Sequence, residues 1–178
     1  MFIAHAPAGY LVTKFVLHRS SLGQGRDAIL MLKLGLLSSV FPDIDMLYFY
    51  FLDHRQHLHH SYWTHIPFWW LVILAIGMGY GVITRNARFR RVVQMVALNV
   101  LLHLLLDTVA AKIRWFAPFS RAGISLFEVP PRYGWWIWNY VLHWTFGIEI
   151  LLAGTALYVC LTHPFPPVSE KHIEGAAD

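Results

Sequence analysis

The sequence predicts an all-α protein, a polytopic membrane helix bundle of about four spanning helices with a short N-terminal helix before them. Of its 178 residues 57% are hydrophobic and only 13% are charged, and the mean hydropathy is +0.48. Residues 66–84 contain no charged side chain. These values differ strongly from those of a soluble globular domain and indicate an integral membrane protein, with the lipid bilayer as its partner.

Other features of the composition narrow the classes of function. The formal charge of +4 is spread over several connecting segments, and no basic run is interleaved with aromatic residues, so nucleic-acid binding is not expected. Cys160 is the only cysteine, which excludes a disulfide bond within the chain. By length the chain forms one domain, which we place at residues 1–162, followed by a disordered tail at 163–178.

Apolar stretches and turn residues predict each element in order. A helix at 7–18 is too short to cross a bilayer untilted, because a helix rises only about 1.5 Å per residue. The Gly- and Ser-rich segment 20–26 follows as a loop, and Asp27 is placed to cap the next helix, which Pro42 ends. We expect spanning helices over residues 28–41, 66–84, 92–113 and 136–162, with the connection at 114–135 lying along the membrane surface.

The third of these apolar runs contains a polar stripe. Asn99, His103 and Asp107 follow one another at intervals of four residues, so they lie on one face of a helix. Ionisable groups at membrane depth are costly and normally face a partner, a cavity or a metal. Either His103 makes a hydrogen bond that packs two helices together, or His103 and Asp107 are two ligands of one metal ion.

The arginines of the chain predict its orientation. Arg85, Arg88, Arg90 and Arg91 lie in one short turn, which places that turn in the cytoplasm. Counting the spans outward brings several polar groups to the opposite, extracytoplasmic face. Those groups are His5, Asp43, Asp45, His60, His65, His103, Asp107 and His143.

Two further pairs have the chemistry of metal ligands. Asp43 and Asp45 follow a proline-terminated helix, and carboxylates this close repel each other unless a cation or a proton relieves them. His60 and His65 offer two imidazoles, which bind zinc and similar divalent ions. Each pair taken alone could also consist of solvent-exposed loop residues that bind no metal. We expect this of the neighbouring His54, His57 and His59.

The sequence resembles the small bacterial inner-membrane proteins called YdjM-like, or membrane-bound metal-dependent hydrolases. The resemblance rests on His5 before a short apolar helix, on Gly35 leading into Pro42-Asp43-Ile-Asp45, and on His60-Ser-Tyr-Trp-Thr64-His65. His103-x-x-x-Asp107 and the later Pro118-Phe-Ser complete it. Where the family commonly has His-Arg-Gly-x-Thr-His-Ser, this chain has Ser61, Tyr62 and Ile66, so it lacks the arginine that would bind a phosphate.

The resemblance implies a hydrolase in the bacterial inner membrane, and it does not specify the substrate. We expect one or two divalent ions, zinc first, with manganese or iron as alternatives, and a metal-activated water as the nucleophile. Asp45 or Asp107 would orient or deprotonate that water, and Thr64 would hydrogen-bond a ligand or a substrate oxygen. A lipid-linked phosphoester or ester suits a site at the membrane surface. The expected metal ligands are His5, Asp43, Asp45, His60, His65, His103 and Asp107, with His143 as an accessory group.

A second function class stays open from the sequence. A non-catalytic membrane protein would use the same ion as a structural or regulatory element, with a coordination sphere closed by protein ligands. A transporter of the ion is less consistent with the sequence, because its ligands would lie near the middle of the bilayer rather than toward one face.

Overall fold

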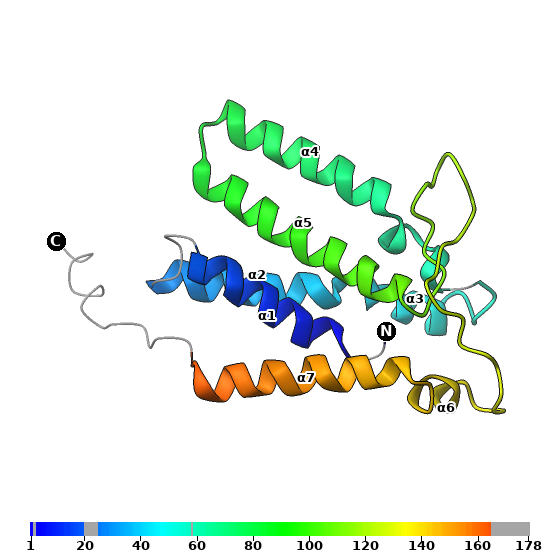
Figure 1. Cartoon of the computed structure of the whole chain (residues 1–178). Coiled ribbons are helices and arrows are strands. Elements are labelled where there is room, and N and C mark those ends of the chain that lie inside the picture. Colours follow the sequence, from blue (N-terminus) through cyan, green and yellow to red (C-terminus); the bar gives the residue numbers. More distant parts are fainter. Residues whose placement is uncertain (2, 20–24, 58, 165–178) are drawn as a thin grey trace.

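The computed structural model describes residues 1, 3–19, 25–57 and 59–164, and the regular structure of this part of the chain is helical, with a long non-helical connection at residues 109–135 (Figure 1). Its only β-type pairing is a single bridge between Ile113 and Ile124. The helices are α1 His5–Arg19, α2 Gly25–Val40, α3 Asp45–Phe51, α4 Pro67–Ile83, α5 Ala87–Thr108, α6 Trp136–Val141 and α7 Thr145–Thr162. Short 3₁₀ helices occur at Phe41–Ile44, His59–Ser61 and Trp63–His65.

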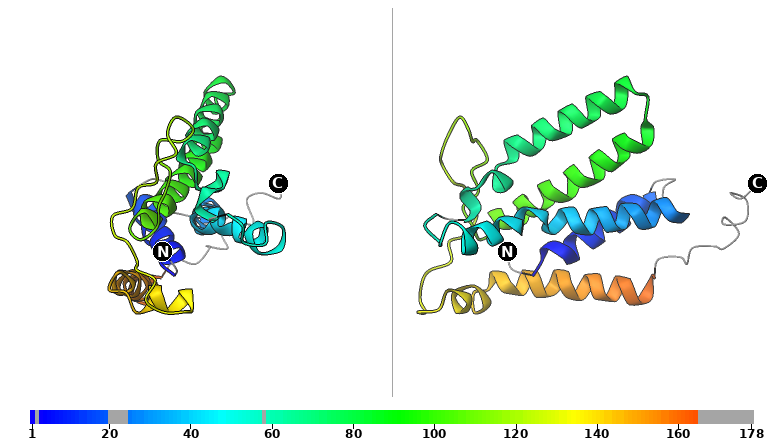
Figure 2. Two further views of the ribbon diagram at one scale, coloured as in Figure 1. Left: turned by 90° about the vertical axis from the view of Figure 1, so that its right-hand side faces the viewer. Right: turned by 180° about the vertical axis from the view of Figure 1, so that it is seen from behind.

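Five long helices form the body of the molecule. α1 contacts α2, α5 and α7, while α4 forms a hairpin with α5 (Figures 1 and 2). The start of α1, the ends of α2 and α5, and the starts of α4 and α7 lie at one end of this body. The α4–α5 turn lies at the opposite end, so helices running in alternating directions bring distant segments together at one end (Figure 1).

Glycines at two positions let α1 approach α2 closely. A Cβ added to Gly9 would lie 2.4 Å from Cβ of Ser39, and one added to Gly35 would lie 2.1 Å from Oγ1 of Thr13. The amide of Asn99 then reaches Thr13 from α5 and donates to its hydroxyl at 3.1 Å. Asn99 therefore contributes to helix packing. The other two polar residues of the stripe on α5, His103 and Asp107, belong to the site described below.

The expected number of about four spanning helices is not what the described residues show. Two helices, α5 and α7, are long and apolar enough to cross a membrane, and only 33% and 17% of their apolar windows are buried inside the protein. α4 is apolar but has 17 residues, about 25 Å of helix, because Pro67 begins it and the turn after Ile83 ends it. α2 has 16 residues and bears charges at Arg26, Asp27 and Lys33.

The boundaries also differ from the expected ones. α5 begins at Ala87 and so includes part of the basic turn, and it ends at Thr108, before the bridge formed by Ile113. The last apolar run is interrupted at residues 142–144, between α6 and α7. α2 begins at Gly25, which puts Asp27 in its first turn, 2.6 Å from Arg88, rather than at its cap. Of the expected tail, residues 165–178 lie outside the described part.

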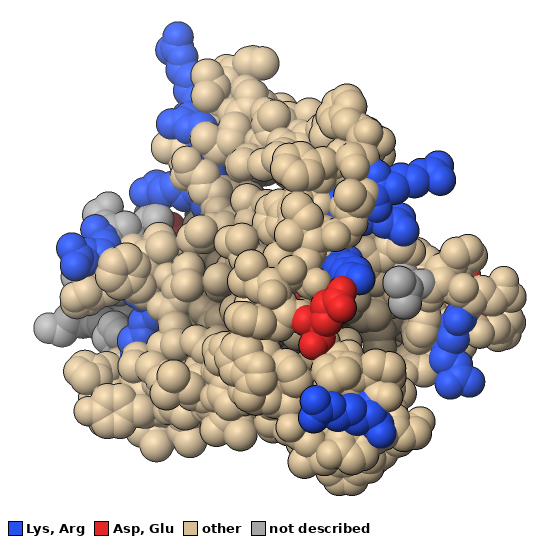
Figure 3. Space-filling model, turned by 45° about the vertical axis from the view of Figure 1, so that its right-hand side comes forward, with Lys and Arg blue, Asp and Glu red and all other residues tan. Residues whose placement is uncertain are grey.

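The surface fits contact with lipid. The face drawn in Figure 3 is mostly uncharged, with its Lys and Arg side chains lying mainly toward the margins of the view. On α7 large apolar side chains are exposed, among them Leu151, Leu157 and Leu161. Apolar surface of this extent is costly in water, and a bilayer would cover it.

Candidate metal centre

Four side chains from three parts of the chain meet at the end of the bundle. Asp43 follows α2, His65 precedes α4, and His103 and Asp107 are one turn apart near the end of α5. One ligand atom from each lies within 4.8 Å of the others. His65, His103 and Asp107 are almost completely buried, while the side chain of Asp43 is 37% exposed. This group could hold a metal ion.

The spacing of the ligand atoms matches the coordination sphere of a small ion. Oδ2 of Asp107 lies 3.1 Å from Nε2 of His103 and 3.5 Å from Nε2 of His65. Oδ1 of Asp43 is 3.6 Å from each of these two nitrogens, which are 3.4 Å from each other. Bonds of 2.0–2.2 Å in a tetrahedral site separate the ligand atoms by about 3.3–3.6 Å. The four groups therefore have room for one ion between them.

Hydrogen bonds behind the two imidazoles direct their other nitrogens inward. Nδ1 of His103 lies 2.8 Å from the carbonyl oxygen of Ser39, which can only accept, so Nδ1 donates. Nδ1 of His65 lies 2.7 Å from Oδ2 of Asp45. Both Nε2 atoms are thus left to face the carboxylates of the site. Oδ2 of Asp107 is buried and, apart from its contacts with these histidines, has no hydrogen-bond partner among the described residues, which a cation would remedy.

Asp45 occupies a different place from the one expected. It contacts Nδ1 of His65, on the side away from the convergent atoms, and so orients that imidazole. The hydroxyl of Thr64 donates to the same carboxylate, and the carbonyl of Thr64 accepts from the indole of Trp70 at 2.8 Å. The reason is local: Asp45 begins α3, so its side chain points to the other side of the chain from Asp43. In this structure Asp45 and Thr64 support a ligand.

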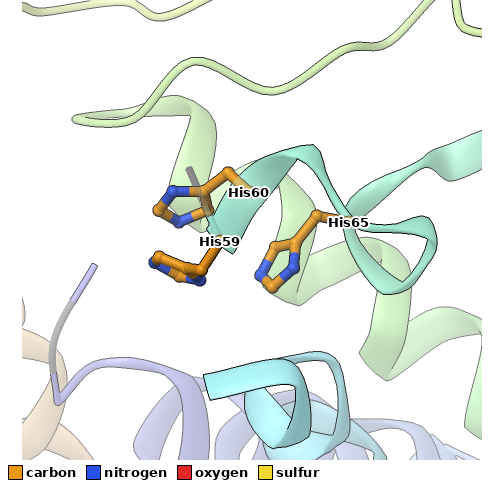
Figure 4. Close-up of side chains that lie close together, drawn as sticks. All are labelled: His59, His60 and His65. Carbon is orange, nitrogen blue, oxygen red and sulfur yellow. The ribbon is translucent and has the colours of Figure 1, made fainter. Parts of the chain in front are cut away.

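His59 and His60 lie close to His65, one member of this group (Figure 4). Nε2 of His60 lies 3.5 Å from Oδ2 of Asp107, and His59, His60 and His65 form a second set with ligand atoms within 4.8 Å. Sequence reasoning treated His59 as a solvated loop residue, but its Nδ1 lies 3.5 Å from Oδ1 of Asp45. His59 lies here because it shares a short 3₁₀ helix with His60. In the sequence, the only indication of this placement was that His59 is adjacent to the candidate ligand His60.

His5 completes the cluster from α1. Its ring stacks on that of His103 with centroids 3.8 Å apart, and its Nε2 lies 3.2 Å from Oδ1 of Asp107. A buried glutamate of α7, Glu149, accepts hydrogen bonds from the backbone of Ile3 and Ala4 and so holds the chain just before His5. This gives Glu149 a positioning role that its sequence position did not indicate.

His143 has other contacts. Its Nδ1 lies 2.8 Å from the hydroxyl of Thr145, and its ring lies beside that of Trp144. Neither of the two sets of possible metal ligands in the described residues includes it.

The carboxylates of the cluster are held in their ionised form. Burial raises the pKa of Asp43, but its contacts with His65 and His103 lower that pKa by more. Burial likewise raises the pKa of Asp45, and its contacts with His59 and His65 bring that pKa below its usual range. Burial lowers the pKa of His65, whereas its contacts with Asp107, Asp43 and Asp45 raise it to about 11. The positive charge on His65 occupies a place that a metal cation would take.

A cavity of about 600 Å³ opens beside the cluster. Its polar lining includes Asp43, His59 and His60 of the cluster region, together with Tyr50 and Arg55. The guanidinium of Arg55 lies 6.0 Å from the ring centre of Tyr50. The backbone of Arg55 has a left-handed conformation, with φ of 63°. The remaining walls are largely apolar and aromatic and include Met46, Phe49, Trp136 and Tyr140.

Apolar helices of membrane length and a buried His/Asp cluster at one end of the bundle define a class: an all-helical membrane protein with a possible metal centre. The chain belongs to the family of YdjM inner membrane proteins, whose family model matches residues 1–165. This match confirms the resemblance seen in the sequence and, with the two apolar helices, fits association with a lipid bilayer and an inner-membrane location. No curated protein and no solved structure matches the chain.

Proposed function

We propose that this protein is a membrane-bound, metal-dependent hydrolase that acts at the membrane surface. The observation that supports it most is the convergence of Asp43, His65, His103 and Asp107. Their ligand atoms lie within 4.8 Å of one another, and each imidazole nitrogen is 3.1–3.6 Å from the two carboxylate oxygens and from the other nitrogen. Two carboxylates and two imidazoles suit zinc, with manganese or iron as alternatives. An ion bound here would lower the pKa of a coordinated water toward about 7 and so supply hydroxide at neutral pH.

The residues of the chain have separate tasks in this proposal. Asp43, His65, His103 and Asp107 bind the ion, and His60 lies beside Asp107 as a further ligand on the side of the cavity. Asp107 is also the carboxylate that would accept a proton, because its Oδ1 is not among the convergent ligand atoms and lies beside His5. Asp45, supported by Thr64, holds the imidazole of His65 in place.

The cavity supports an amphipathic substrate with an anionic group. Its apolar and aromatic walls would accommodate an acyl or isoprenoid chain. The cationic side chain of Arg55 lines the same cavity. A guanidinium binds phosphate with two parallel hydrogen bonds. Arg55 would therefore take the role of the arginine that the segment from His60 to His65 lacks. A lipid-linked phosphoester is therefore the first substrate class to test, and an ester of a lipid is the second.

A structural ion is the competing function, since four protein ligands can close a tetrahedral site. The exposure of Asp43 favours catalysis. Its side chain is 37% exposed and lines the cavity together with His60, so one side of the ion position is accessible to a substrate. A closed structural site would have each of its ligands shielded.

The test is metal analysis of the protein purified in detergent, followed by hydrolysis assays on phosphomonoesters, phosphodiesters, carboxylic esters and amides. We expect a bound divalent ion, activity that a chelator removes and the ion restores, and loss of both in His103→Ala. His57→Ala is the matched control, because His57 is 66% exposed and its ring contacts Asp53 outside the cluster. Bound metal without hydrolysis of any substrate class would reject the enzyme and favour the structural ion.

A further inference from the structure

The cavity beside the metal centre opens at the surface between two short helices. Tyr50 of α3 and Trp136 of α6 both line the cavity, and each of these residues is also 42% exposed. A residue that lines a cavity and is exposed lies at its opening, so the opening lies where α3 and α6 reach the surface. Both helices are at the end of the bundle that carries the metal centre (Figures 1 and 2).

The surface around this opening is apolar and aromatic. After Asp45, α3 contains no charged residue, and α6 contains none. Large apolar side chains are exposed on both helices, among them Leu47, Phe51 and Trp138. Each helix is only about 10 Å long, so neither crosses a bilayer, and tryptophan and tyrosine are typical of the layer where lipid head groups meet the chains. The opening therefore suits contact with lipid at the level of the head groups.

The lining of the cavity suits an anionic head group. Arg55 is exposed and lines the cavity, and Asp43 is the only acidic residue among the described residues that line it. In the proposed function Asp43 binds the metal ion, which leaves a guanidinium and the ion to attract an anion. The first residue of α3, Asp45, contacts His65, so only the length of this short helix separates the cluster from the apolar surface.

We propose that the substrate reaches the metal centre from the bilayer, through the opening between α3 and α6. A phosphoester lipid keeps its chains in the leaflet on the side of the metal face, against the two helices, and its phosphate binds beside Arg55. This inference rests on the proposed function, because it names the route and the substrate class of the same site. Small water-soluble phosphoesters are then poor substrates, since they lack the chains that α3 and α6 contact.

Photocrosslinking in phosphatidylcholine vesicles tests this route without relying on hydrolysis. The purified protein carries photoreactive benzoylphenylalanine in place of Trp136. The vesicles contain either an alkyne-labelled, ether-linked phosphonate analogue of phosphatidic acid, which has no ester bond to hydrolyse, or the ether-linked diglyceride with the same chains. We expect about tenfold more crosslinking of the phosphonate, the effect of a hydrogen bond to a charged group. An excess of water-soluble glycerol phosphate should not displace it.

Variants show whether the preference arises at this opening. Arg55→Gln should remove the preference for the phosphonate, whereas Arg121→Gln, which changes an exposed arginine outside the lining, should keep it. The same label in place of Leu157, which is 60% exposed on α7, should crosslink both lipids equally. A label in place of Tyr50 gives the same readout from α3 where the Trp136 variant does not fold.

The outcomes separate the route from the proposed function. Equal crosslinking of the two lipids at Trp136 and Tyr50, or displacement by glycerol phosphate as readily as by unlabelled phosphonate, would overturn entry from the bilayer. The proposed hydrolase would stand in that case, with a water-soluble substrate. Preferential crosslinking in a protein that binds no metal would support the lipid route and overturn the hydrolase.

Discussion

Nδ1 of His65 lies 2.7 Å from Oδ2 of Asp45, and this contact determines which nitrogen of His65 faces the metal position. A carboxylate behind a ligating imidazole fixes the ring and makes the imidazole a stronger ligand. Asp45 receives a second hydrogen bond from Thr64, so its own orientation is fixed too. The first predictions follow from this arrangement of ligand and support.

Removing the support should weaken the metal without removing its ligands. Asp45→Ala leaves His65 free to rotate, so we expect metal affinity to fall about 10- to 100-fold at unchanged stoichiometry. Competition with a chelating dye measures the affinity. Asp27→Ala is the control, because Asp27 pairs with Arg88 far from the site. Equal affinity in wild type and Asp45→Ala would show that Asp45 has no part in orienting His65.

Asp107→Asn separates an enzyme from a structural ion. Asparagine keeps the shape of the side chain but loses its charge, so the cation is bound more weakly and no cavity opens. For a catalytic centre, hydrolysis should fall by orders of magnitude while thermal stability changes little. For a structural ion, metal and stability should be lost together, because binding energy is then folding energy. Activity assays and thermal unfolding in detergent distinguish the two, and unchanged activity would reject the catalytic role.

Protons should compete with the metal. Because the pKa of His65 is raised to about 11, its imidazole is protonated at pH 7 in the metal-free protein, and the ion must displace that proton. Apparent affinity should therefore decrease as the pH falls, by about tenfold per pH unit for one displaced proton. Calorimetry in buffers of different ionisation enthalpy counts the protons released. Equal affinity at pH 6 and pH 8 would contradict this prediction.

Close packing of α1 should matter to the site. Gly9→Ala places a Cβ 2.4 Å from Cβ and Oγ of Ser39, whose carbonyl orients His103. We expect a loss of about 1–3 kcal/mol in stability from overpacking, together with weaker metal binding. Gly154→Ala on α7 is the matched control, because a Cβ there would meet nothing within 4 Å. Thermal unfolding and metal titration of the two variants test both effects, and similar behaviour of the two would refute the prediction.

Orientation is tested by labelling in intact cells. In a Cys160→Ser background, a cysteine near Arg88, in place of the exposed Ala87, should be shielded from an impermeant thiol reagent, because the arginines of that turn favour the cytoplasmic side. A cysteine in place of Gln56, which lies near the metal face, should be labelled. Both positions are exposed, so accessibility within the protein does not decide the result. The opposite pattern would place the metal face in the cytoplasm.

Local regularities of the chain determined the helical class and the pairing of His103 with Asp107. A long apolar run in a membrane must form a helix, because its backbone N–H and C=O groups have no water to bind and pair with each other instead. Positions four apart lie on the same face of any helix. The alternation of helix directions likewise made it predictable that Asp43, His65 and His103 would reach one end of the bundle. These inferences depend only on spacing along the chain.

The tertiary structure decided the rest. The exact ends of α4 and α5, and hence which helices have membrane length, were established only by the structure. Asp43 and Asp45 were equivalent candidates in the sequence, but the start of α3 sends one toward the ion position and the other behind His65. His59 and Glu149 acquired partners only through contacts across the fold. Side-chain direction at a helix end and contacts between distant segments follow from the packed backbone, because a local pattern of residues does not encode which neighbour a side chain meets.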